Sequence, residues 1–438
     1  FAFVEVKPKV KRDKKNKNIN ITFDVREGPR VFVERFDITG NVRTIDKVIR
    51  RETQIAEGDA FNASKLRRGR RKIQDLNYFN KVDFKRARGS APDKTVIQID
   101  VEEKSTGSLT FGVGYSTDVG ALIDVGLKEN NLLGKGQKLG FSGSFAGEKS
   151  TASISFTEPY FLDRDIAAGF DTYHVVEGLQ ASGSHDRKKT GFGLRAGYPI
   201  SPDLRQNLRY KIESTKVENV SSTASNLIKA QKGSRTLSEV GHNLTYNALN
   251  KRINPTDGFL IKMTNDVAGL GGNVRYFRNQ FKATQYNELL SDWTLAFKGE
   301  VGHILGIDQD VKLIDRFGLG GRNLRGFTSS GVGPRDIASD DALGGEWRYN
   351  GSTQMQFPLG LPNELGISGR IFSDFGSLGE VNPSNANIRD SGSLRVSAGT
   401  GLGWVSPFGP IKIDFAWALA KEDYDKTELM RFDFGTRF

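Results

Sequence analysis

The residue types that most often catalyse reactions or bind metals are sparse in this chain of 438 residues. It has no cysteine, which excludes disulfides and thiolate chemistry. The four histidines are scattered without metal-ligand spacing: His174, His185, His242 and His303. No Gly-x-Ser-x-Gly sequence, the turn that carries the nucleophile of many hydrolases, lies near any of them. We therefore expect a protein that is not an enzyme, with no metal and no cofactor, although barrel enzymes without soluble-enzyme motifs exist.

Three clustered glycines, Gly318, Gly320 and Gly321, invite comparison with a phosphate-binding loop. No helix is predicted after them and no Lys-Ser or Lys-Thr pair closes the segment, so the comparison fails. They lie in a connection of about 40 residues, from about 304 to 343, which is far longer than ordinary connections between strands. A connection of this length usually has a function of its own.

The elements that must position this connection are strands. The last nine residues alternate between an apolar face (Met430, Phe432, Phe434, Thr436 and Phe438) and a polar face (Arg431, Asp433, Gly435 and Arg437). An apolar face toward lipid and a charged face toward a wet lumen are typical of a membrane barrel. After residue 104 we expect sixteen strands, near 107–116, 121–130, 136–146, 150–158, 165–177, 187–199, 205–218, 233–248, 257–269, 273–290, 292–303, 345–357, 365–375, 393–404, 410–420 and 429–438. An even number returns both ends of the barrel to one side of the membrane.

The strands of a soluble β-sandwich or propeller would also show alternating apolar and polar side chains. Such a fold is disfavoured because the second face carries charges such as Lys412 and Asp414 where another apolar layer would have to pack. Mean hydropathy is -0.45, and no apolar run approaches the roughly 18 residues of a transmembrane helix. The predicted fold class is therefore an all-β transmembrane barrel of 16 antiparallel strands at 105–438, preceded by an α+β arm.

The arm carries most of the net charge of +11, since residues 1–104 hold 26 Lys and Arg against 16 Asp and Glu. The basic residues are not interleaved with stacking aromatics, so we expect no nucleic-acid partner. Residues 30–104 predict a β-α-α-β-β module with helices at 44–52 and 63–76. Residues 1–29 repeat its last hairpin, as Phe1-x-x-Val4-x-Val6 matches Phe79-x-x-Val82-x-Phe84. We interpret them as the end of a sister module that is cut short at Phe1.

Several motifs together indicate a family. Leu324-Arg325-Gly326-Phe327 lies within the long connection, and further matches are Pro255-Thr256-Asp257-Gly258, Gly344-Gly345, Ile371-Phe372-Ser373-Asp374-Phe375-Gly376 and Trp404-Val405-Ser406-Pro407-Phe408-Gly409-Pro410. With these motifs the chain resembles the BamA superfamily of outer-membrane assembly and secretion proteins, and the arm at 30–104 resembles a POTRA domain. In that family the long connection folds back into the lumen and its arginine contacts the inner wall.

The residues of this chain permit that contact. If Ile367 and Ile371 face lipid, Phe372 and Asp374 face the lumen. Asp374 can then accept a bidentate pair from Arg325, and Phe372 can offer its ring to the guanidinium. The family commonly has an inward acid on the preceding strand, where this chain has Gln356. We expect Gln356 to be a neutral acceptor. The alternative is that Arg325 lies on an exposed loop.

The resemblance implies a mechanical function, in which client outer-membrane proteins pair with a lateral gate between the first and last strands, fold and leave into the membrane without ATP. The predicted seam contains Gly107, Gly112, Gly114, Phe432, Phe434, Gly435 and Phe438, with Gly112 and Gly435, or near neighbours of them, as a trial cysteine pair. Glycine weakens strand pairing. The alternative is that small residues on the lumen side make room for the inserted connection. The implied partners are unfolded clients, periplasmic lipoproteins on the arm and outer-membrane lipids, in a Gram-negative outer membrane with the arm and the carboxyl terminus on the periplasmic side.

Two alternatives stay open. A two-partner secretion pore would export one polypeptide through an open channel and would usually have two periplasmic modules and a plugging amino-terminal helix. A passive porin would conduct steadily and would need neither the arm nor the arginine-bearing connection.

Overall fold

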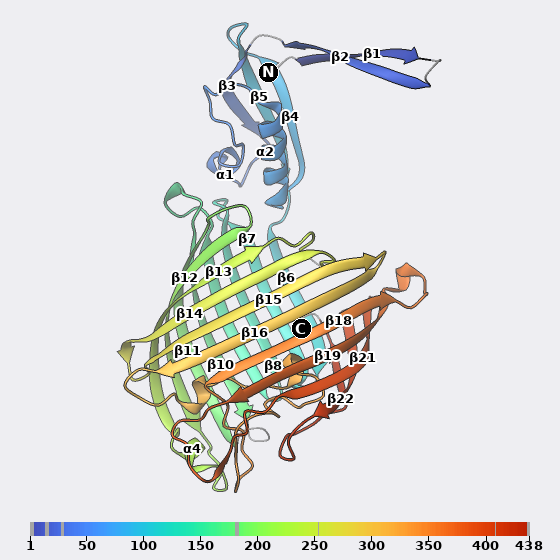
Figure 1. Ribbon diagram of the computed structural model, residues 1–438. Coiled ribbons are helices and arrows are strands. Elements are labelled where there is room, and N and C mark those ends of the chain that lie inside the picture. Colours follow the sequence, from blue (N-terminus) through green and yellow to red (C-terminus); the bar gives the residue numbers. More distant parts are fainter. Residues whose placement is uncertain are drawn as a thin grey trace. The chain divides into compact units, whose positions relative to one another are not determined.

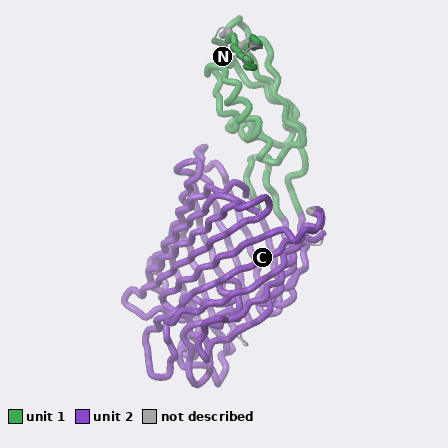
Figure 2. The backbone as a smooth tube through the Cα atoms, turned by 45° about the vertical axis from the view of Figure 1, so that its right-hand side comes forward, with its two compact units in different colours: residues 1–108, 128–139 green, residues 109–127, 140–438 purple. Residues whose placement is uncertain are grey.

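A computed structural model describes residues 4–13, 17–27, 30–179, 184–252, 254–407 and 409–435. The chain divides into two compact units (Figure 2). Unit 1 consists of residues 1–108 and 128–139, and unit 2 consists of residues 109–127 and 140–438.

Unit 1 contains the predicted β-α-α-β-β module (Figure 1). Its sheet has the order β3 (Phe32–Thr39), β5 (Lys94–Glu103), β4 (Phe79–Arg88), in which β3 is parallel and β4 antiparallel to β5. Two helices, α1 (Asp46–Arg50) and α2 (Ala63–Asp75), connect β3 to β4. Thus the order of elements predicted for the arm is correct, and α1 is shorter than the predicted 44–52.

Helix α2 begins where Asn62 caps it, because the Asn62 side chain accepts hydrogen bonds from the backbone N–H groups of Ser64 and Lys65. One stripe of the helix faces the sheet, with Leu66 and Ile73 buried. These side chains join a core built from all the elements of the module. Outside this core, β1 (Val4–Asp13) pairs with β2 (Asn18–Glu27) as a separate antiparallel hairpin.

A hairpin tip at residues 128–139 completes unit 1, although its two strands continue into the barrel. The backbone N–H of Ile45 donates to the carbonyl oxygen of Gly134 at 3.0 Å. Tyr78 donates to the carbonyl oxygen of Asn130 at 2.8 Å, and the Asn131 amide donates to the Thr44 hydroxyl at 2.9 Å. These bonds join three segments that are distant in sequence, which makes unit 1 a discontinuous domain.

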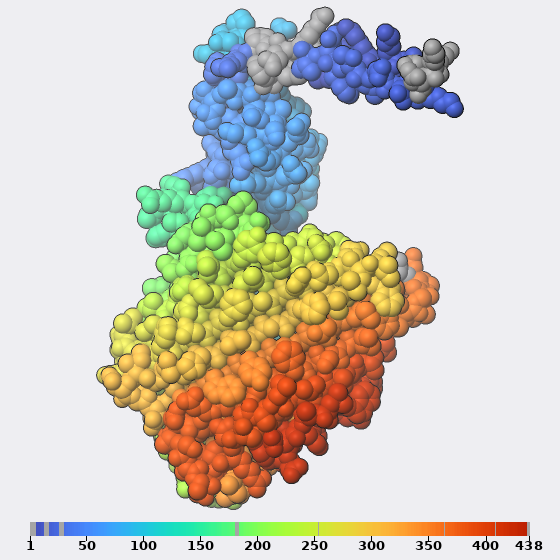
Figure 3. Space-filling view, in the orientation of Figure 1, coloured from blue at the N-terminus to red at the C-terminus, as the bar shows by residue number. Residues whose placement is uncertain are grey.

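Unit 2 is a closed antiparallel barrel (Figure 1). Within the described residues its sixteen strands are β6 (Gly107–Ser116), β7 (Gly120–Leu132), β8 (Gln137–Ala146), β9 (Lys149–Glu158), β10 (Ala167–Leu179), β11 (His185–Pro199), β12 (Leu204–Glu218), β13 (Gly233–Asn247), β14 (Gly258–Gly272), β15 (Tyr276–Leu290), β16 (Trp293–Gly306), β18 (Trp347–Pro358), β19 (Ile367–Gly379), β21 (Arg395–Ser406), β22 (Gly409–Ala420) and β23 (Met430–Phe434). The predicted fold class is confirmed. Consecutive strands cross one face of the barrel as slanting bands in Figure 3.

The barrel has its apolar side chains outside and its charges inside. On β22, Phe415, Trp417 and Leu419 are exposed on the outer face, whereas Ala416 between them is buried. The buried polar residues of the strands include Glu239, Asp266, Asp374 and Arg395. This arrangement is the reverse of a β-sandwich and matches a wall between lipid and a polar lumen.

No helix among the described residues is long and apolar enough to span a membrane. Of the predicted strand 429–438, β23 covers Met430–Phe434, and Gly435 follows as a bend. Thr436, Arg437 and Phe438 lie outside the described residues.

The hairpin tip gives the first testable prediction. Gly134 has a φ of 71°, and a Cβ there would lie 1.8 Å from the carbonyl oxygen of Arg43. We expect Gly134→Ala to break the bond between Ile45 and the tip, so that amide hydrogen exchange of peptides covering residues 43–48 accelerates by at least about tenfold.

Gly120→Ala is the matched control. Gly120 has a similar φ of 77° at another hairpin turn, but a Cβ there meets nothing within 4 Å. Both substitutions carry the same backbone penalty. If the two variants accelerated hydrogen exchange at residues 43–48 equally, the clash with Arg43 would not explain the faster exchange in Gly134→Ala.

Candidate functional site

The candidate site centres on the connection between β16 and β18, residues 307–346, here called the inserted loop. Two bridges, Phe317↔Gly345 and Leu319↔Val332, shape the loop. Its apolar side chains pack against the barrel wall and form a core with it. The members of this core are Leu237, Ala268, Val274, Tyr276, Ile304, Val311, Phe317, Leu319, Leu324, Phe327, Val332 and Leu378. Leu324 and Phe327, which flank the Arg-Gly pair, are fully buried. The inserted loop is thus folded against the wall.

Arg325 meets the wall at β19. Its Nε donates to Oδ2 of Asp374 at 2.7 Å and its Nη2 donates to Oδ1 at 2.7 Å, a bidentate pair. The backbone N–H of Arg325 also donates to Asp374. The guanidinium carbon lies 3.3 Å from the centre of the Phe372 ring. The structure therefore places Arg325, Phe372 and Asp374 together.

Burial makes this pair sensitive to change. The side chain of Asp374 is 2% exposed and that of Arg325 is 11% exposed. A buried ion pair offsets its desolvation only when its remaining hydrogen-bonding groups also find partners. Here they do, because Nη1 donates to Gln354 and Nη2 donates to the Ser352 hydroxyl. Removing either charge would leave the other buried without a counterion.

The amide that accepts from Arg325 is that of Gln354, at 3.0 Å, and the prediction of Gln356 for this place was wrong. The strand register explains the difference. Gln354 is opposite Phe372, whereas Gln356 is opposite Arg370, one step farther along the wall. Both residues face the same side, so alternation alone could not separate them.

Gly326 permits the close approach of the loop to the wall. Its φ is 89°, and a Cβ there would lie 3.2 Å from the Cβ of Ser397 and 3.5 Å from the Cβ of Ala416. A larger residue would be strained by its backbone and would press on two strands of the wall.

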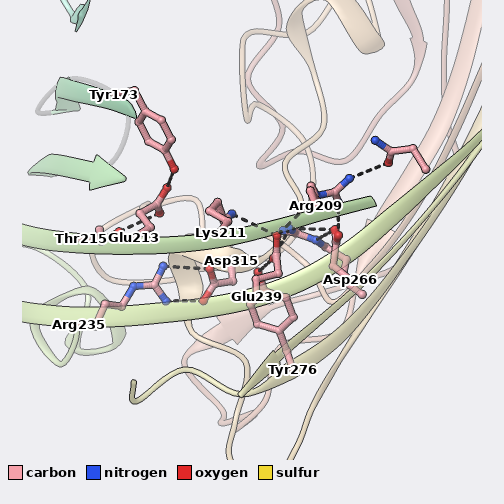
Figure 4. Close-up of polar contacts among 12 residues, drawn as sticks. Tyr173, Arg209, Lys211, Glu213, Thr215, Arg235, Glu239, Asp266, Tyr276 and Asp315 are labelled. Carbon is pink, nitrogen blue, oxygen red and sulfur yellow. Dashed lines mark hydrogen bonds and ion pairs between the residues drawn. The ribbon is translucent and has the colours of Figure 1, made fainter. Parts of the chain in front are cut away.

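A second ion pair holds the inserted loop on β13, and the sequence analysis did not predict it. Arg235 makes a bidentate pair with Asp315, with Nη2 donating to Oδ1 at 2.9 Å (Figure 4). Asp315 lies in the short 3-10 turn Leu313–Asp315 near the start of the loop. Arg235 and Asp315 are 80 residues apart in the sequence, so no local pattern of residues could have predicted their contact.

Beside this pair, the wall contains a buried charge network that sequence reasoning also missed (Figure 4). Glu239 accepts a hydrogen bond from Tyr276 at 2.5 Å and pairs with Arg278 at 3.2 Å and with Lys211 at 3.3 Å. Asp266 pairs with Arg209 and Arg278. These residues are on four neighbouring strands, so the network ties β12, β13, β14 and β15 together from inside.

The far end of the inserted loop is held to a short helix, α4 (Asn226–Lys229). The Ser225 hydroxyl donates to Asp336 at 2.9 Å, and the backbone N–H of Ser225 donates to Asp341 at 2.7 Å. Burial opposes the ionisation of Asp336, but hydrogen bonds from Ser339 and Ser225 outweigh it and hold the pKa of Asp336 below its usual value. The carboxylate is therefore charged when it accepts these bonds.

The barrel closes between β23 and β6, here called the seam. Among the described residues, these strands pair at two positions, Asp433↔Ser116 and Phe434↔Tyr115. Two further bonds extend the contact, since the Thr117 N–H donates to the carbonyl oxygen of Phe432, and the Phe432 N–H donates to the Thr117 hydroxyl. By comparison, β22 and β21 pair from Val396↔Ala420 to Ser406↔Gly409, so within the described residues the seam is the shorter junction.

Of the glycines predicted at the seam, Gly114 and Gly435 lie where β6 meets β23, whereas Gly107 lies elsewhere on β6. A Cβ on Gly435 would lie 2.9 Å from the Cα of Gly114, so these two glycines allow the strands to approach closely. Gly435 is therefore next to Gly114, which is a near neighbour of Gly112 in the trial cysteine pair. Gly107 begins β6 and lies near Glu129. Phe432 stacks obliquely on Tyr115 with ring centres 6.0 Å apart, and Phe438 lies outside the described residues.

The histidines do not assemble into a site in the part of the chain that the structure describes. His174 bonds to Thr190 and His242 to Gln206. No group of three His, Cys, Asp or Glu side chains there could hold a metal ion. The expectation of a protein without catalysis stays a prediction.

The Arg325 pair gives the second testable prediction. Asp374→Asn keeps the shape of the side chain but leaves the Arg325 charge buried without a counterion, at a cost of about 3–5 kcal/mol. We expect the inserted loop to detach from β19, so that trypsin cleaves after Arg325 at least about tenfold faster in membrane vesicles. Mass spectrometry of the fragments identifies the site.

Asp414→Asn is the control, because Asp414 also pairs with an arginine of the lumen wall, Arg370 at 2.6 Å. That pair is about as exposed as Arg325 and does not involve the inserted loop. Equal acceleration in both variants would mean that any lost lumen charge loosens the loop, and would contradict a specific anchor.

Comparisons with known proteins agree with this architecture. Residues 131–438 match the model of the Omp85 superfamily domain, and residues 31–104 match the POTRA model, described as a surface antigen variable number repeat. The chain is 32% identical, over its full length, to the outer membrane protein assembly factor BamA of Neorickettsia risticii, and spans 59% of that protein. It is 27% identical to the human sorting and assembly machinery component 50 homolog, with 88% of this chain and 81% of that protein covered.

Among solved structures, the crystal structure of BamA from Haemophilus ducreyi lacking POTRA domains 1–3 superposes with a TM-score of 0.85. That likeness covers 100% of this chain and 90% of the other at 24% identity, and so concerns the fold. Since the Omp85 model alone covers more than half of the residues, the chain belongs to the Omp85 superfamily, with a POTRA domain at 31–104 and a 16-stranded barrel.

Proposed function

We propose that this chain is the barrel and last POTRA domain of an outer-membrane protein assembly factor. Its site of action is the seam between β6 and β23, which opens sideways to the lipid. Relatives that carry the name of assembly factors support this class of function. The observation that carries the proposal is the seam itself, with two residue pairs among the described residues of β23 and β6.

A seam that opens suits this function because an open strand edge offers unpaired N–H and C=O groups to another strand. Among the described residues, β23 pairs with β6 only at Tyr115 and Ser116. The outer side chains Leu109 and Phe111, nearer the start of β6, are 76% and 71% exposed. A client strand can pair there by β-augmentation. Its own backbone groups are then bonded before they meet lipid, where an unpaired group is costly.

The proposed cycle needs no nucleotide. A client barrel gains free energy by forming its own strand pairs and by burying its apolar face in lipid, and that gain drives release. The POTRA domain at 31–104 then faces the periplasm, receives unfolded clients and binds accessory lipoproteins. This assigns the protein to the outer membrane of a Gram-negative bacterium, with the carboxyl terminus on the periplasmic side and without enzymatic activity.

The test locks the seam. Tyr115 and Phe434 are direct partners across it, and the chain has no other cysteine to interfere. With Tyr115→Cys and Phe434→Cys together, the oxidised protein in lipid vesicles should lose at least about nine tenths of its ability to fold a urea-denatured client barrel, because the edge is no longer accessible. Reduction should restore it. Folding is measured by the heat-modified electrophoretic mobility of the client.

The matched control is Val267→Cys with Phe277→Cys, a directly opposed pair on β14 and β15 whose side chains are also exposed on the outer face. Oxidation there should leave assembly unchanged. Full activity with the seam locked would overturn the gate. In the same vesicles, a large and steady conductance that the seam disulfide does not alter would identify a porin, and export of one dedicated polypeptide would identify a secretion pore.

A further inference from the structure

A cluster of polar side chains crosses the seam at the lumen side and includes the inserted loop. We call it the seam clasp, and its members are Ser116, Asp118, Arg322, Ser329, Arg431 and Asp433. Ser116 and Asp118 belong to the end of β6 and the turn after it, whereas Arg431 and Asp433 are on β23. Arg322 and Ser329 belong to the inserted loop, on either side of Arg325. The clasp thus joins three segments of the chain: the end of β6 with the turn after it, β23, and the inserted loop.

Arg322 contacts both sides of the seam. Its Nη2 donates to the Ser116 hydroxyl at 3.2 Å and to Oδ1 of Asp433 at 2.9 Å. Its Nε lies 3.7 Å from Oδ2 of Asp118. One guanidinium therefore joins the first strand to the last.

The two strands also contact each other directly within the clasp. Ser116 donates to Asp433 at 2.9 Å, and Arg431 donates to Asp118 at 2.7 Å. Ser329 adds a hydrogen bond from the loop to the same carboxylate of Asp118. Asp433 and Arg431 are buried, so each of these contacts replaces water that the charged groups would otherwise bind.

The backbone of the inserted loop also holds the segment that leads into β23. The Glu428 N–H donates to the carbonyl oxygen of Gly326 at 3.1 Å, and the Thr328 N–H donates to that of Lys426 at 3.0 Å. The Lys426 N–H donates to the carbonyl oxygen of Gly331 at 2.9 Å. These three bonds begin one residue after Arg325, so the wall anchor and the hold on the last strand are on the same piece of backbone.

We propose that the inserted loop is the third part of the gate and that Arg322 is the positioning residue through which it keeps the seam closed. The loop is held to β19 by Arg325 and reaches the seam with Arg322 and with the backbone of residues 326–331. Opening the seam then requires Arg322 to leave Ser116, Asp433 or both. This inference rests on the proposed function, because it concerns the control of that same gate.

The placement of the charges supports this role. The described residues of β6 and β23 form few backbone bonds, so a side-chain network contributes a larger share of the stability of this part of the seam than it would between two long strands. A charge-assisted hydrogen bond to a buried carboxylate contributes more than a neutral one. A client strand that pairs with the end of β6 would compete for Ser116 and Thr117, and so would act on the clasp directly.

The test measures the seam without any client. Val113 on β6 and Met430 on β23 are exposed on the outer face and accept spin labels through introduced cysteines. Double electron–electron resonance in lipid vesicles then reports the distance between the strands. We expect Arg322→Ala to raise the population with separated strands by about tenfold, the effect of losing one charge-assisted hydrogen bond. Arg322→Lys, which keeps the charge but cannot reach all three partners, should give a smaller increase.

Two controls test whether the change in strand separation comes from the loss of the Arg322 contacts at the seam. Arg370→Ala removes another lumen arginine, which pairs with Asp414 and not with the loop or the seam, and should leave the distances unchanged. Arg322→Ala should also leave trypsin cleavage after Arg325 unchanged, because the Asp374 pair remains. Asp374→Asn, in contrast, should increase both the cleavage and the separated population, since it frees the loop from the wall.

The outcomes separate this inference from the proposed gate. Unchanged distances in Arg322→Ala would overturn the role of Arg322, while loss of client folding by the oxidised seam would still support the gate. Fast cleavage after Arg325 in Arg322→Ala would also overturn the proposed role of Arg322. It would mean that Arg322 holds the inserted loop on the wall and does not hold the seam closed. An active locked seam would refute the gate, whatever the distances show.

Discussion

The structure depends on barrel closure. A strand in lipid needs a hydrogen-bonded neighbour on each side, because no water is present to bond an open edge. Every barrel strand from β7 to β21 is paired with two long neighbours, whereas β23 meets β6 over two residue pairs within the described residues. Between the described residues of this junction, side-chain contacts add to the free energy of the short backbone ladder. The side chains of the seam clasp and the backbone of the inserted loop are the groups placed to add to it.

The inserted loop can do so because it is itself fixed. Two bidentate arginine–carboxylate pairs, Arg325 with Asp374 and Arg235 with Asp315, tie it to β19 and β13. Its apolar core fixes the backbone between these points. Buried ion pairs add little net stability compared with apolar packing, but they penalise misplacement strongly. The loop therefore has a definite position in the lumen, which a clasp at the seam requires.

Alternation of side chains was enough to predict the barrel, and with the family resemblance it also brought Arg325, Phe372 and Asp374 together. It determines which face of a strand a residue occupies, and Phe372 and Asp374 needed no more than that. It does not determine register, so Gln354 and Gln356 were indistinguishable, and the partner of Gly435 could be narrowed only to Gly112 or its near neighbours. Contacts such as Arg235 with Asp315 or Arg322 with Asp433 depend on where a long loop comes to rest. That is a property of the whole packing arrangement, which no local pattern of residues encodes.

The hairpin tip at 128–139 bears on how such chains are made and how they diverge. Its bonds to Thr44, Ile45 and Tyr78 mean that the POTRA domain lacks part of its surface until the second hairpin of the barrel has been synthesised. The compact unit is complete only when about 35 residues beyond residue 104 are available to fold with it. In evolution, an exchange of arms between relatives at a single crossover near residue 104 would separate the domain from its own tip. Productive recombination would have to carry the first two barrel strands along with the arm.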